Sequence, residues 1–190
     1  LTPFFRSEVG GRRVVAVAAG GEHSLFLAEG GAVLSCGRGT GGMLGHGNEH
    51  TQLAPKLVAS LEGRCIVQVA AGTNHSLFLA EGGAVLSCGD GDAGRLGHGD
   101  KEKQLVPKPV AALEGRRVVQ VAADTCHSLF VMEGGTALSC GWGRSGRLGH
   151  GDEEKQLLPK LVAALEGKRV VEVAAGDYHS LFLVQRGAVL

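Results

Sequence analysis

The sequence repeats itself every 52 residues, and this interval constrains the fold more than any other feature. Four copies of a phrase that opens with His-Ser-Leu-Phe recur at that spacing, and they begin at His23, His75, His127 and His179. A repeat of this length is typical of one supersecondary unit that buries its apolar side chains against copies of itself. A residue that occurs once in every unit is therefore expected to build the unit rather than to carry out chemistry.

The chain divides into three complete units and two partial ones. We expect complete units at 12–63, 64–115 and 116–167, a partial unit at 168–190, and a repeat tail at 1–11. Both ends fall inside a unit, which would leave strand edges unpaired. We therefore expect a portion of a larger array, or an array that closes by self-association through its open edges.

Each unit is predicted to form four short strands. In the second unit, 66–71 is rich in β-branched residues, 75–80 and 84–88 are apolar runs on either side of a glycine-containing turn, and 107–113 is a last apolar stretch. Two apolar runs around such a turn are typical of a β-hairpin. A helical unit is disfavoured, because 32 of the 190 residues are glycine and each glycine weakens a helix. The sequence therefore predicts an all-β fold, and four-stranded units repeated without helices are the pattern of a β-propeller.

Composition limits the class of partner. The 19 basic and 19 acidic side chains cancel, so no net charge favours nucleic acid or an anionic membrane as a partner. No apolar run approaches the ~20 residues that a membrane-spanning helix needs. Cys36, Cys88 and Cys140 recur at the repeat interval and would be spread through the array rather than paired. We therefore expect an intracellular location, either cytoplasmic or nuclear.

Motifs that could carry chemistry are better explained by the repeat. The pattern G-x-G-x-x-G occurs at 37–42, 89–94 and 141–146, but each copy is followed by LGHG instead of the helix that a dinucleotide site requires. Adjacent His-Ser pairs point to opposite faces of a strand, so they cannot act together as base and nucleophile. We expect no catalytic residue, no cofactor and no metal site, and hence no enzyme activity in this chain.

The LGHG phrase supplies a second set of repeated residues. Its histidines lie a whole unit apart, whereas zinc ligands usually come in closely spaced pairs. We interpret them as structural and expect each to donate a hydrogen bond to a loop carbonyl. The structural motif then contains the four histidines of the His-Ser pairs and the residues Gly45, His46, Gly97, His98, Gly149 and His150.

These phrases together resemble the regulator of chromosome condensation repeat. The resemblance rests on CGDGDAGRLGHGD, a strand with an early proline, IVQVAAG and HSLFL, and it covers essentially the whole chain in more than three copies. It implies a seven-bladed β-propeller, of which this chain would supply about three and two-thirds blades. Two departures stand out. Cysteine occupies the usual tryptophan position of each complete unit, and Asp124 replaces a glycine, which would be tolerable if that glycine has a positive φ.

Differences between units indicate where a partner would bind. The second and third units share 38 of 52 residues and differ, in part, in the loop before LGHG. Loops on a rigid frame commonly carry recognition. The candidate partner-binding residues are Arg38, Asp90, Asp92, Trp142 and Arg144. Trp142, the single tryptophan of the chain, either anchors an interface or packs between blades.

The basic turns between units are a weaker candidate. Arg12, Arg64, Arg116 and Lys168 occupy equivalent corners of successive units and would form an arc on one face of a propeller. Basic side chains at exposed turns are most simply a solvated surface, and a docking rim is the second interpretation. The sequence alone does not separate the two.

The sequence predicts a binding module. Repeat arrays offer extended surfaces, and the resemblance extends to propellers of giant HECT-type ubiquitin ligases. It implies a scaffold that docks a protein partner through rim loops, as the recognition part of a larger ligase or regulatory protein. The alternative it implies is guanine nucleotide exchange on a Ran-like GTPase. That activity is linked in the family to an insertion and a basic tail. Complete units of equal length leave no room for the insertion, and no basic tail is visible in this sequence. A third activity known in the family is light sensing, which relies on clustered tryptophans. A chain with one tryptophan cannot form such a cluster.

Overall fold

The strands form where the apolar runs of each unit predict them. The computed structural model describes residues 8–185 and residue 189. The first sheet contains β1 (Glu8–Val9), β2 (Arg12–Ala19), β3 (His23–Ala28), β4 (Val33–Gly37) and β5 (Gln52–Leu57). The second contains β6 (Ile66–Ala71), β7 (His75–Ala80), β8 (Val85–Gly89) and β9 (Gln104–Pro109). The third contains β10 (Val118–Ala123), β11 (His127–Met132), β12 (Ala137–Gly141) and β13 (Gln156–Leu161), and the last contains β14 (Val170–Ala175) and β15 (Ser180–Val184).

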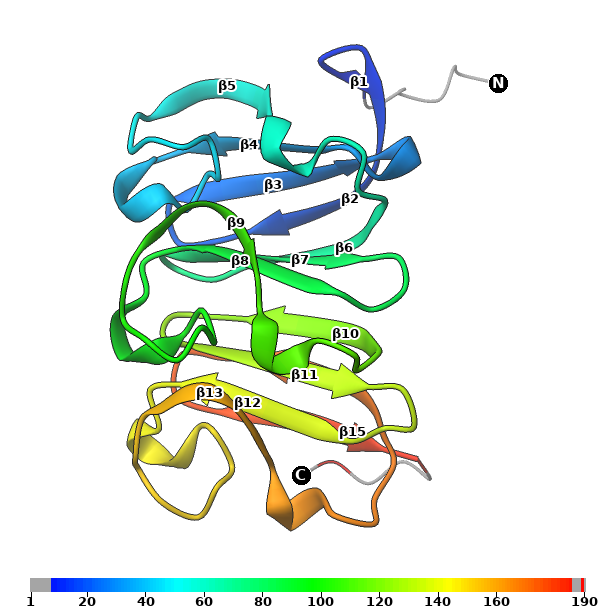
Figure 1. Ribbon diagram of the computed structural model, residues 1–190, viewed down its shortest axis with the longest axis vertical. Coiled ribbons are helices and arrows are strands. Elements are labelled where there is room, and N and C mark those ends of the chain that lie inside the picture. The colour runs from blue at the N-terminus through cyan, green and yellow to red at the C-terminus, as the bar shows by residue number, and fades with distance from the viewer. Residues whose placement is uncertain (1–7, 186–188, 190) are drawn as a thin grey trace.

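All pairings between these strands are antiparallel, and strand order within each sheet follows chain order (Figure 1). We call β2–β5 the first blade, β6–β9 the second, β10–β13 the third, and β14–β15 the partial fourth blade. The prediction of an all-β fold with four antiparallel strands in a unit is confirmed. Residues 1–7 of the expected tail, and 186–188 and 190 of the expected partial unit, lie outside the described residues.

Short 3-10 helices occupy the connections between strands. They are η1 (Glu29–Gly31), η2 (Thr40–Gly42), η3 (Ala59–Leu61), η4 (Asp92–Gly94), η5 (Ala111–Leu113), η6 (Arg144–Gly146) and η7 (Ala163–Leu165). Glycines interrupt the surrounding segments too often for longer helices to form. Within the described part of the chain, no helix is long and apolar enough to cross a membrane.

The first residues of the described chain depart from the repeat. Val9 pairs with Arg12, so Glu8–Val9 adds a short strand to the edge of β2. The positions one unit later lie in the 3-10 helix η3 instead. Gly10 and Gly11 allow this tight reversal because both have positive φ values, 59° and 72°, which glycine adopts without steric cost.

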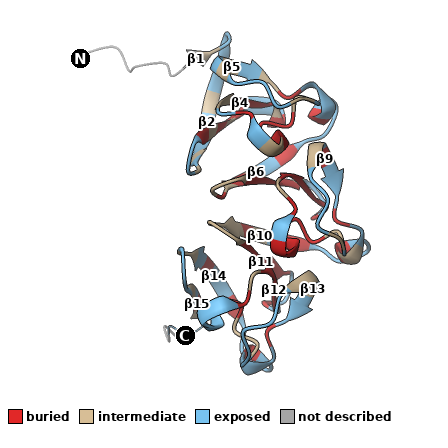
Figure 2. Ribbon diagram, turned by 90° about the vertical axis from the view of Figure 1, so that its left-hand side faces the viewer, coloured by how far each residue is buried: buried red, intermediate tan, exposed pale blue. Residues whose placement is uncertain are grey.

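The inner strands β2, β6, β10 and β14 lie next to one another, and the outer strands lie on the opposite side (Figure 2). In the second blade, the Gln68 side chain reaches across to the next inner strand. Its Nε2 donates to the Val121 carbonyl, and its Oε1 accepts from the Val121 amide, both at 3.0 Å. Gln120 Oε1 accepts from the Val173 amide at 3.2 Å. A side chain therefore joins successive sheets that have no strand pairing between them.

The apolar core lies between blades rather than within one of them (Figure 2). Leu25 of the first blade packs with Phe78 and Cys88 of the second. Leu77 of the second blade packs with Phe130 of the third in the same way. A single sheet cannot bury both faces, so each blade depends on its neighbour for most of its hydrophobic stabilisation.

The glycine that Asp124 replaces is required by lack of space and not by its φ. Gly20 and Gly72 lie outside the left-handed region, so the condition of a positive φ is not met. A Cβ on Gly20 would lie 2.3 Å from the Gly72 carbonyl oxygen and 2.6 Å from the His23 ring. The Asp124 amide lies 3.3 Å from the His127 carbonyl oxygen, whereas the Gly20 amide lies 2.8 Å from that of His23. The third blade therefore accommodates a bulkier residue with a longer hydrogen bond.

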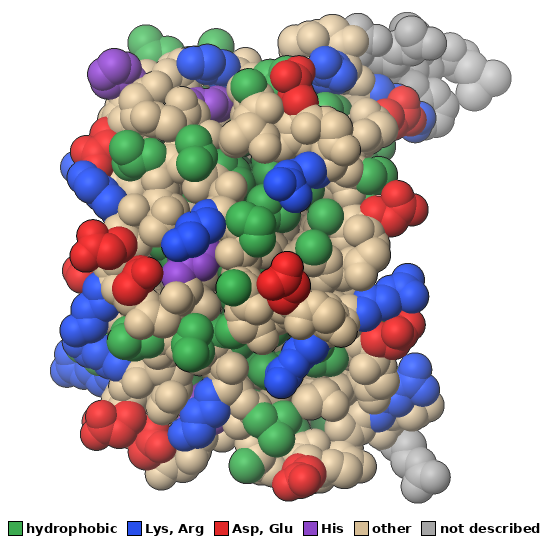
Figure 3. All heavy atoms as spheres, viewed as in Figure 1, with side chains coloured by type: hydrophobic (Ala, Val, Ile, Leu, Met, Phe, Trp, Pro, Cys, Tyr) green, Lys and Arg blue, Asp and Glu red, His purple; other side chains and the backbone are tan. Residues whose placement is uncertain are grey.

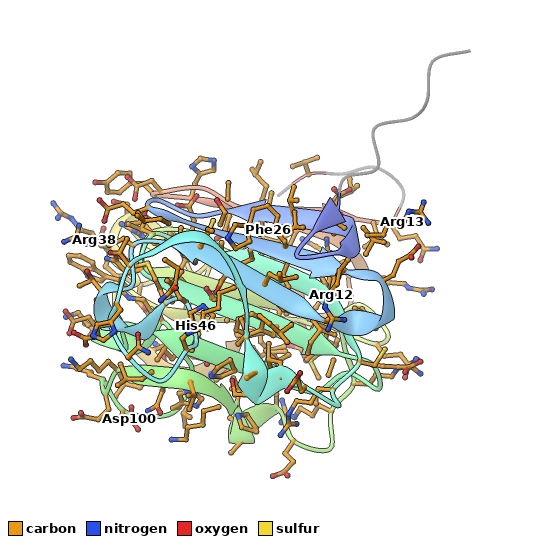
Figure 4. The ribbon with its side chains drawn as sticks, turned by 90° about the horizontal axis from the view of Figure 1, so that it is seen from above. Arg12, Arg13, Phe26, Arg38, His46 and Asp100 are labelled. Atoms are coloured by element: carbon orange, nitrogen blue, oxygen red, sulfur yellow. The ribbon has the colours of Figure 1, made fainter. Side chains whose placement is uncertain are left out.

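Replacing a phenylalanine between blades tests this source of stability. Phe130 is fully buried between the second and third blades, and Phe130→Ala is expected to lower the free energy of unfolding by about 3–5 kcal/mol. Phe26 occupies the equivalent position on the first blade, faces away from the second, and is only half-buried (Figure 4). We expect Phe26→Ala to cost less than about half as much. Urea denaturation measures both, and equal losses would contradict a core located between blades.

Candidate functional site

Strand connections occupy two opposite faces of the row of blades (Figure 1). The loop face is formed by the connection after each inner strand and by the long loop that precedes each outer strand. Its segments are 20–22, 38–51, 72–74, 90–103, 124–126, 142–155 and 176–178. The turn face holds the hairpin turns and the links between blades. Arg38 and Asp100 lie on the loop face, and Arg12 and Arg13 lie at the opposite edge (Figure 4).

A hydrogen-bonded latch joins each blade to the next beneath the loop face. His23 Nε2 lies 2.8 Å from Ser76 Oγ, and this hydroxyl donates to the Met43 carbonyl oxygen, also at 2.8 Å. Equivalent contacts of 2.6–2.9 Å recur in the sets His75, Ser128, Arg95 and His127, Ser180, Arg147. We call each set a His–Ser latch. The serine belongs to the following blade and not to the histidine's own His-Ser pair, so the latch connects two blades.

The latch determines the protonation state of its histidine. Ser76 uses its single proton on the Met43 carbonyl, so the contact requires His23 Nε2 to donate. Nδ1 of His23, His75 and His127 is buried without a hydrogen-bond partner among the described residues. Burial lowers the pKa of His23 and of His127 to about 4, and it lowers the pKa of His75 well below the ordinary value. These three imidazoles are therefore neutral at pH 7.

The LGHG histidines make a second repeated contact within each blade. His46 Nε2 lies 3.0 Å from Ser35 Oγ, which donates to the Leu44 carbonyl oxygen at 2.8 Å. The same contacts occur at His98 and His150. The expected loop carbonyl is therefore the wrong partner, because a serine hydroxyl stands between it and the imidazole. The preceding glycines, which have φ values of 75–77°, are Gly45, Gly97 and Gly149.

Two arginines that the sequence analysis did not single out are buried beneath the loop face. Arg95 is 5% exposed and Arg147 is 3% exposed. Arg147 Nε donates to the Arg144 carbonyl oxygen at 2.9 Å, and Nη1 donates to the Asp177 carbonyl oxygen of the partial fourth blade at 2.6 Å. Arg95 makes the equivalent bonds one unit earlier. The available signal was the repeated arginine of GRLGHG, whose position in the first unit is occupied by Met43.

The structure places all the candidate partner-binding residues on the loop face but divides them among three loops. These residues are Arg38 in the first blade, Asp90 and Asp92 in the second, and Trp142 and Arg144 in the third. Arg38 forms an ion pair with Glu22 at 2.6 Å, and Asp90 lies 3.6 Å from the buried Arg95. Trp142 is half-buried. Partner binding by these residues stays a prediction.

The loop face is hollowed between the first and second blades. The hollow measures about 460 Å³, and its walls include Arg38 from the first blade and Asn74 and Asp90 from the second. Lys103 reaches across it to pair with Glu49. Charged side chains of both signs gather along this edge of the molecule (Figure 3). The surface around the hollow is therefore polar, and its positive and negative side chains largely balance one another.

Two of the basic turns on the turn face contain an arginine that pairs with a glutamate. Arg13 forms an ion pair with Glu29, and Arg117 lies 3.2 Å from Glu133 at the equivalent place in the third blade. All four side chains are exposed, so these pairs contribute little to stability. The arrangement fits a solvated surface better than a docking rim.

The cysteines at the family's tryptophan position include buried thiols. Cys88 Sγ lies 3.6 Å from the Met43 carbonyl oxygen, and Cys140 Sγ lies 3.7 Å from that of Arg95. Burial raises the pKa of both thiols far above the ordinary value, so they stay protonated and unreactive. Within the described residues, no group of three or more histidines, cysteines and carboxylates is placed to hold a metal ion.

Known proteins share this architecture. The sequence matches the model of the RCC1-like domain over residues 2–182. It is 40% identical over 177 residues to the ultraviolet-B receptor UVR8 of Arabidopsis thaliana, covering 93% of this chain and 40% of the receptor. It is 38% identical over 187 residues to the E3 ubiquitin-protein ligase HERC2 of Homo sapiens, covering 97% of this chain and 4% of the ligase.

A solved structure has a similar fold. The fold resembles that of Prp20p from Saccharomyces cerevisiae, a protein characterised for its binding to Gsp1p and histones. The TM-score is 0.82 and the sequence identity is 26%, over 91% of this chain and 44% of that one. The chain thus spans less than half the length of each of these three proteins.

The latches predict that stability falls in mild acid. The folded-state pKa of His127 is about 4 and the ordinary value is 6.5, so protonation favours the unfolded chain. The stabilisation is complete above pH 6.5 and is lost as the pH falls toward 4. Between pH 7.5 and pH 5, the chain should lose about 2 kcal/mol more stability than the variant His127→Asn, which cannot titrate.

Urea denaturation at several pH values measures this difference. His50→Asn removes an exposed histidine outside the latches and is the matched control. It should follow the pH dependence of the unaltered chain. A His127→Asn variant with the same pH dependence as the unaltered chain would contradict a neutral, buried His127.

Proposed function

Because this chain belongs to the RCC1-like domain family, we propose that it is a protein-interaction scaffold that docks a protein partner through its loop face. The observation that carries the proposal is a contrast between frame and loops. Latches and LGHG contacts recur from blade to blade, whereas the loop residues before LGHG differ in charge and size. A repeated frame fixes where each loop lies, and loops on a rigid frame commonly carry recognition.

We also propose that the domain has no catalytic activity of its own. The latch histidines are not available as bases, since they donate through Nε2 to a serine of the next blade. The buried thiols of Cys88 and Cys140 are held protonated. These groups stabilise contacts between blades and do not face the loop surface as reactive atoms would.

The role of a larger parent protein is proposed from the relatives. HERC2 is an E3 ubiquitin-protein ligase by name, and this chain matches 4% of its length. We propose that the chain is the recognition part of a larger ubiquitin ligase or regulatory protein in the cytoplasm or nucleus. Five free thiols support a reducing compartment. The likeness to UVR8 supports the fold but not light sensing, because the chain has one tryptophan.

The second candidate is guanine nucleotide exchange on a Ran-like GTPase. The structural similarity to Prp20p, which is characterised for binding Gsp1p and histones, favours it. Against it, the complete units have equal length and leave no room for an inserted element. Release of labelled GDP from a Ran-like GTPase separates the candidates. A rate well above the spontaneous rate would replace the scaffold proposal, and a rate equal to it would remove the alternative.

Capture of a partner by matched variants tests the scaffold proposal. The loop-face variant carries Arg38→Ala, Asp92→Ala and Arg144→Ala, and the turn-face control carries Arg12→Ala, Arg64→Ala and Arg116→Ala. All six residues are exposed, so both variants should fold. We expect a protein captured by the unaltered chain from a cognate lysate to bind the loop-face variant at least about tenfold more weakly and the control equally well.

The affinity for the captured protein is then measured by titration with each purified variant. Loss of binding by the control alone would move the docking site to the turn face and contradict the proposal. Failure of the unaltered chain to capture any protein would count against a scaffold role altogether.

A further inference from the structure

We propose that the loop face at the junction of the third blade and the partial fourth blade binds an acidic segment of the protein partner. This inference rests on the proposed function and specifies the chemistry of the partner. The junction holds two aromatic and three basic side chains, which we call the cation–aromatic cluster: Trp142, Arg144, Arg147, Lys155 and Tyr178. The long loops of the three complete blades are held by the same contacts. Among the described residues, the contacts between cations and aromatic rings lie at this junction.

Arg147 fixes the two aromatic rings relative to each other. Its guanidinium carbon lies 5.9 Å from the centre of the Trp142 ring and 4.8 Å from that of the Tyr178 ring. The side chain is buried and is held by two backbone carbonyls, one from each blade. A planar guanidinium between two rings is favoured electrostatically, and here it joins an aromatic residue from each blade. Tyr178 keeps 57% of its surface exposed, so the pair is accessible to a ligand.

Two exposed cations lie over the same tryptophan. Arg144 is 5.9 Å and Lys155 is 5.5 Å from the centre of the Trp142 ring. Within the described residues, neither cation forms an ion pair with a carboxylate. Their contacts with the ring restrain two long side chains before any ligand arrives, which lowers the entropy lost on binding.

Two of the three acidic residues of the same loop have other partners for their carboxylates. Asp152 Oδ1 accepts from the Glu154 amide at 3.0 Å, and its Oδ2 lies 3.9 Å from Lys160. Glu153 Oε1 accepts from the Ser145 amide at 3.0 Å. These contacts direct the two carboxylates toward their own loop or the outer strand. The charges of Arg144 and Lys155 are therefore left for an external anion.

The equivalent positions in the earlier blades are compensated internally. Arg38 takes the place of Trp142 in the first blade and pairs with Glu22. Lys103 takes the place of Lys155 in the second blade and pairs with Glu49. The cations Arg38 and Lys103 are thus paired within the chain, whereas Arg144 and Lys155 of the third junction are left for an external anion.

The cluster suits carboxylates attached to a peptide. An arginine stacked on a ring directs its N–H groups outward, where they can donate to both oxygens of a carboxylate. The exposed parts of Trp142 and Tyr178 can contact the methylene stems of glutamate or aspartate side chains. A nucleic acid needs a longer basic track than two exposed cations on a chain of zero net charge. An acidic peptide is the occupant that fits.

Trp142 provides an intrinsic probe, because it is the single tryptophan of the chain. The experiment titrates the full chain with a short capped oligoglutamate peptide and records tryptophan emission at low salt. An oligolysine peptide of equal length and a single-stranded DNA oligonucleotide of equal charge are titrated in parallel. We expect a saturable emission change with oligoglutamate, no saturable change with oligolysine, and weaker binding of DNA. The affinity should fall as salt rises, because the charges are exposed.

Each of two variants removes two cations, one pair from the cation–aromatic cluster and one pair from the loop face of the earlier blades. Arg144→Gln with Lys155→Gln should weaken oligoglutamate binding about tenfold, whereas Arg38→Gln with Lys103→Gln should change it less than about twofold. Absence of saturable binding, equal losses in the two variants, or tighter binding of DNA would overturn the inference. If oligoglutamate fails while the loop-face variant still loses its captured protein, this inference falls and the proposed function stands.

Discussion

The hydrogen bond from a buried histidine of one blade to a serine of the next is the contact on which the rest of the structure depends. At the first interface, it brings together the Met43 carbonyl, the His23 imidazole and the Ser76 hydroxyl, which come from a loop and two strands. The imidazole must present Nε2–H for this contact, and burial lowers its pKa so that the ring is neutral. Because polar groups buried without partners are costly, the latch also limits how two apolar sheet faces can slide past each other.

The periodic part of the sequence predicted the repeated part of the structure. Alternating apolar runs gave the hairpins, and recurrence at 52 residues separated structural histidines from catalytic ones. Contacts between blades could not be predicted, because their partners lie 30–53 residues apart and periodicity does not identify them. The hydrogen bonds from Arg147 to the Asp177 carbonyl and from Gln68 to the Val121 carbonyl are examples of such contacts between blades. The close packing around the glycine that Asp124 replaces was not visible in the sequence for the same reason, since one of its neighbours is a carbonyl oxygen of the next blade.

The frame explains how nearly identical units can present different surfaces. Latches, glutamine bridges and shared apolar cores hold the loops, so a change in the loop before LGHG alters the surface without altering the blade. Arg38, Asp90 and Trp142 occupy the same position of successive units and give a paired cation, a paired anion and an aromatic ring. A propeller of this kind holds its loops at fixed positions, and the side chains on those loops determine which partner binds.

The tautomer of the latch histidines is the most direct test of this account. Long-range nitrogen–proton correlation spectra of the labelled chain at pH 7 report which imidazole nitrogen carries the proton. The latch contacts predict neutral rings protonated at Nε2 for His23, His75 and His127, with slow exchange of that proton with solvent. Rings protonated at Nδ1, or doubly protonated at that pH, would contradict this prediction, because neither state is compatible with the buried contacts between blades.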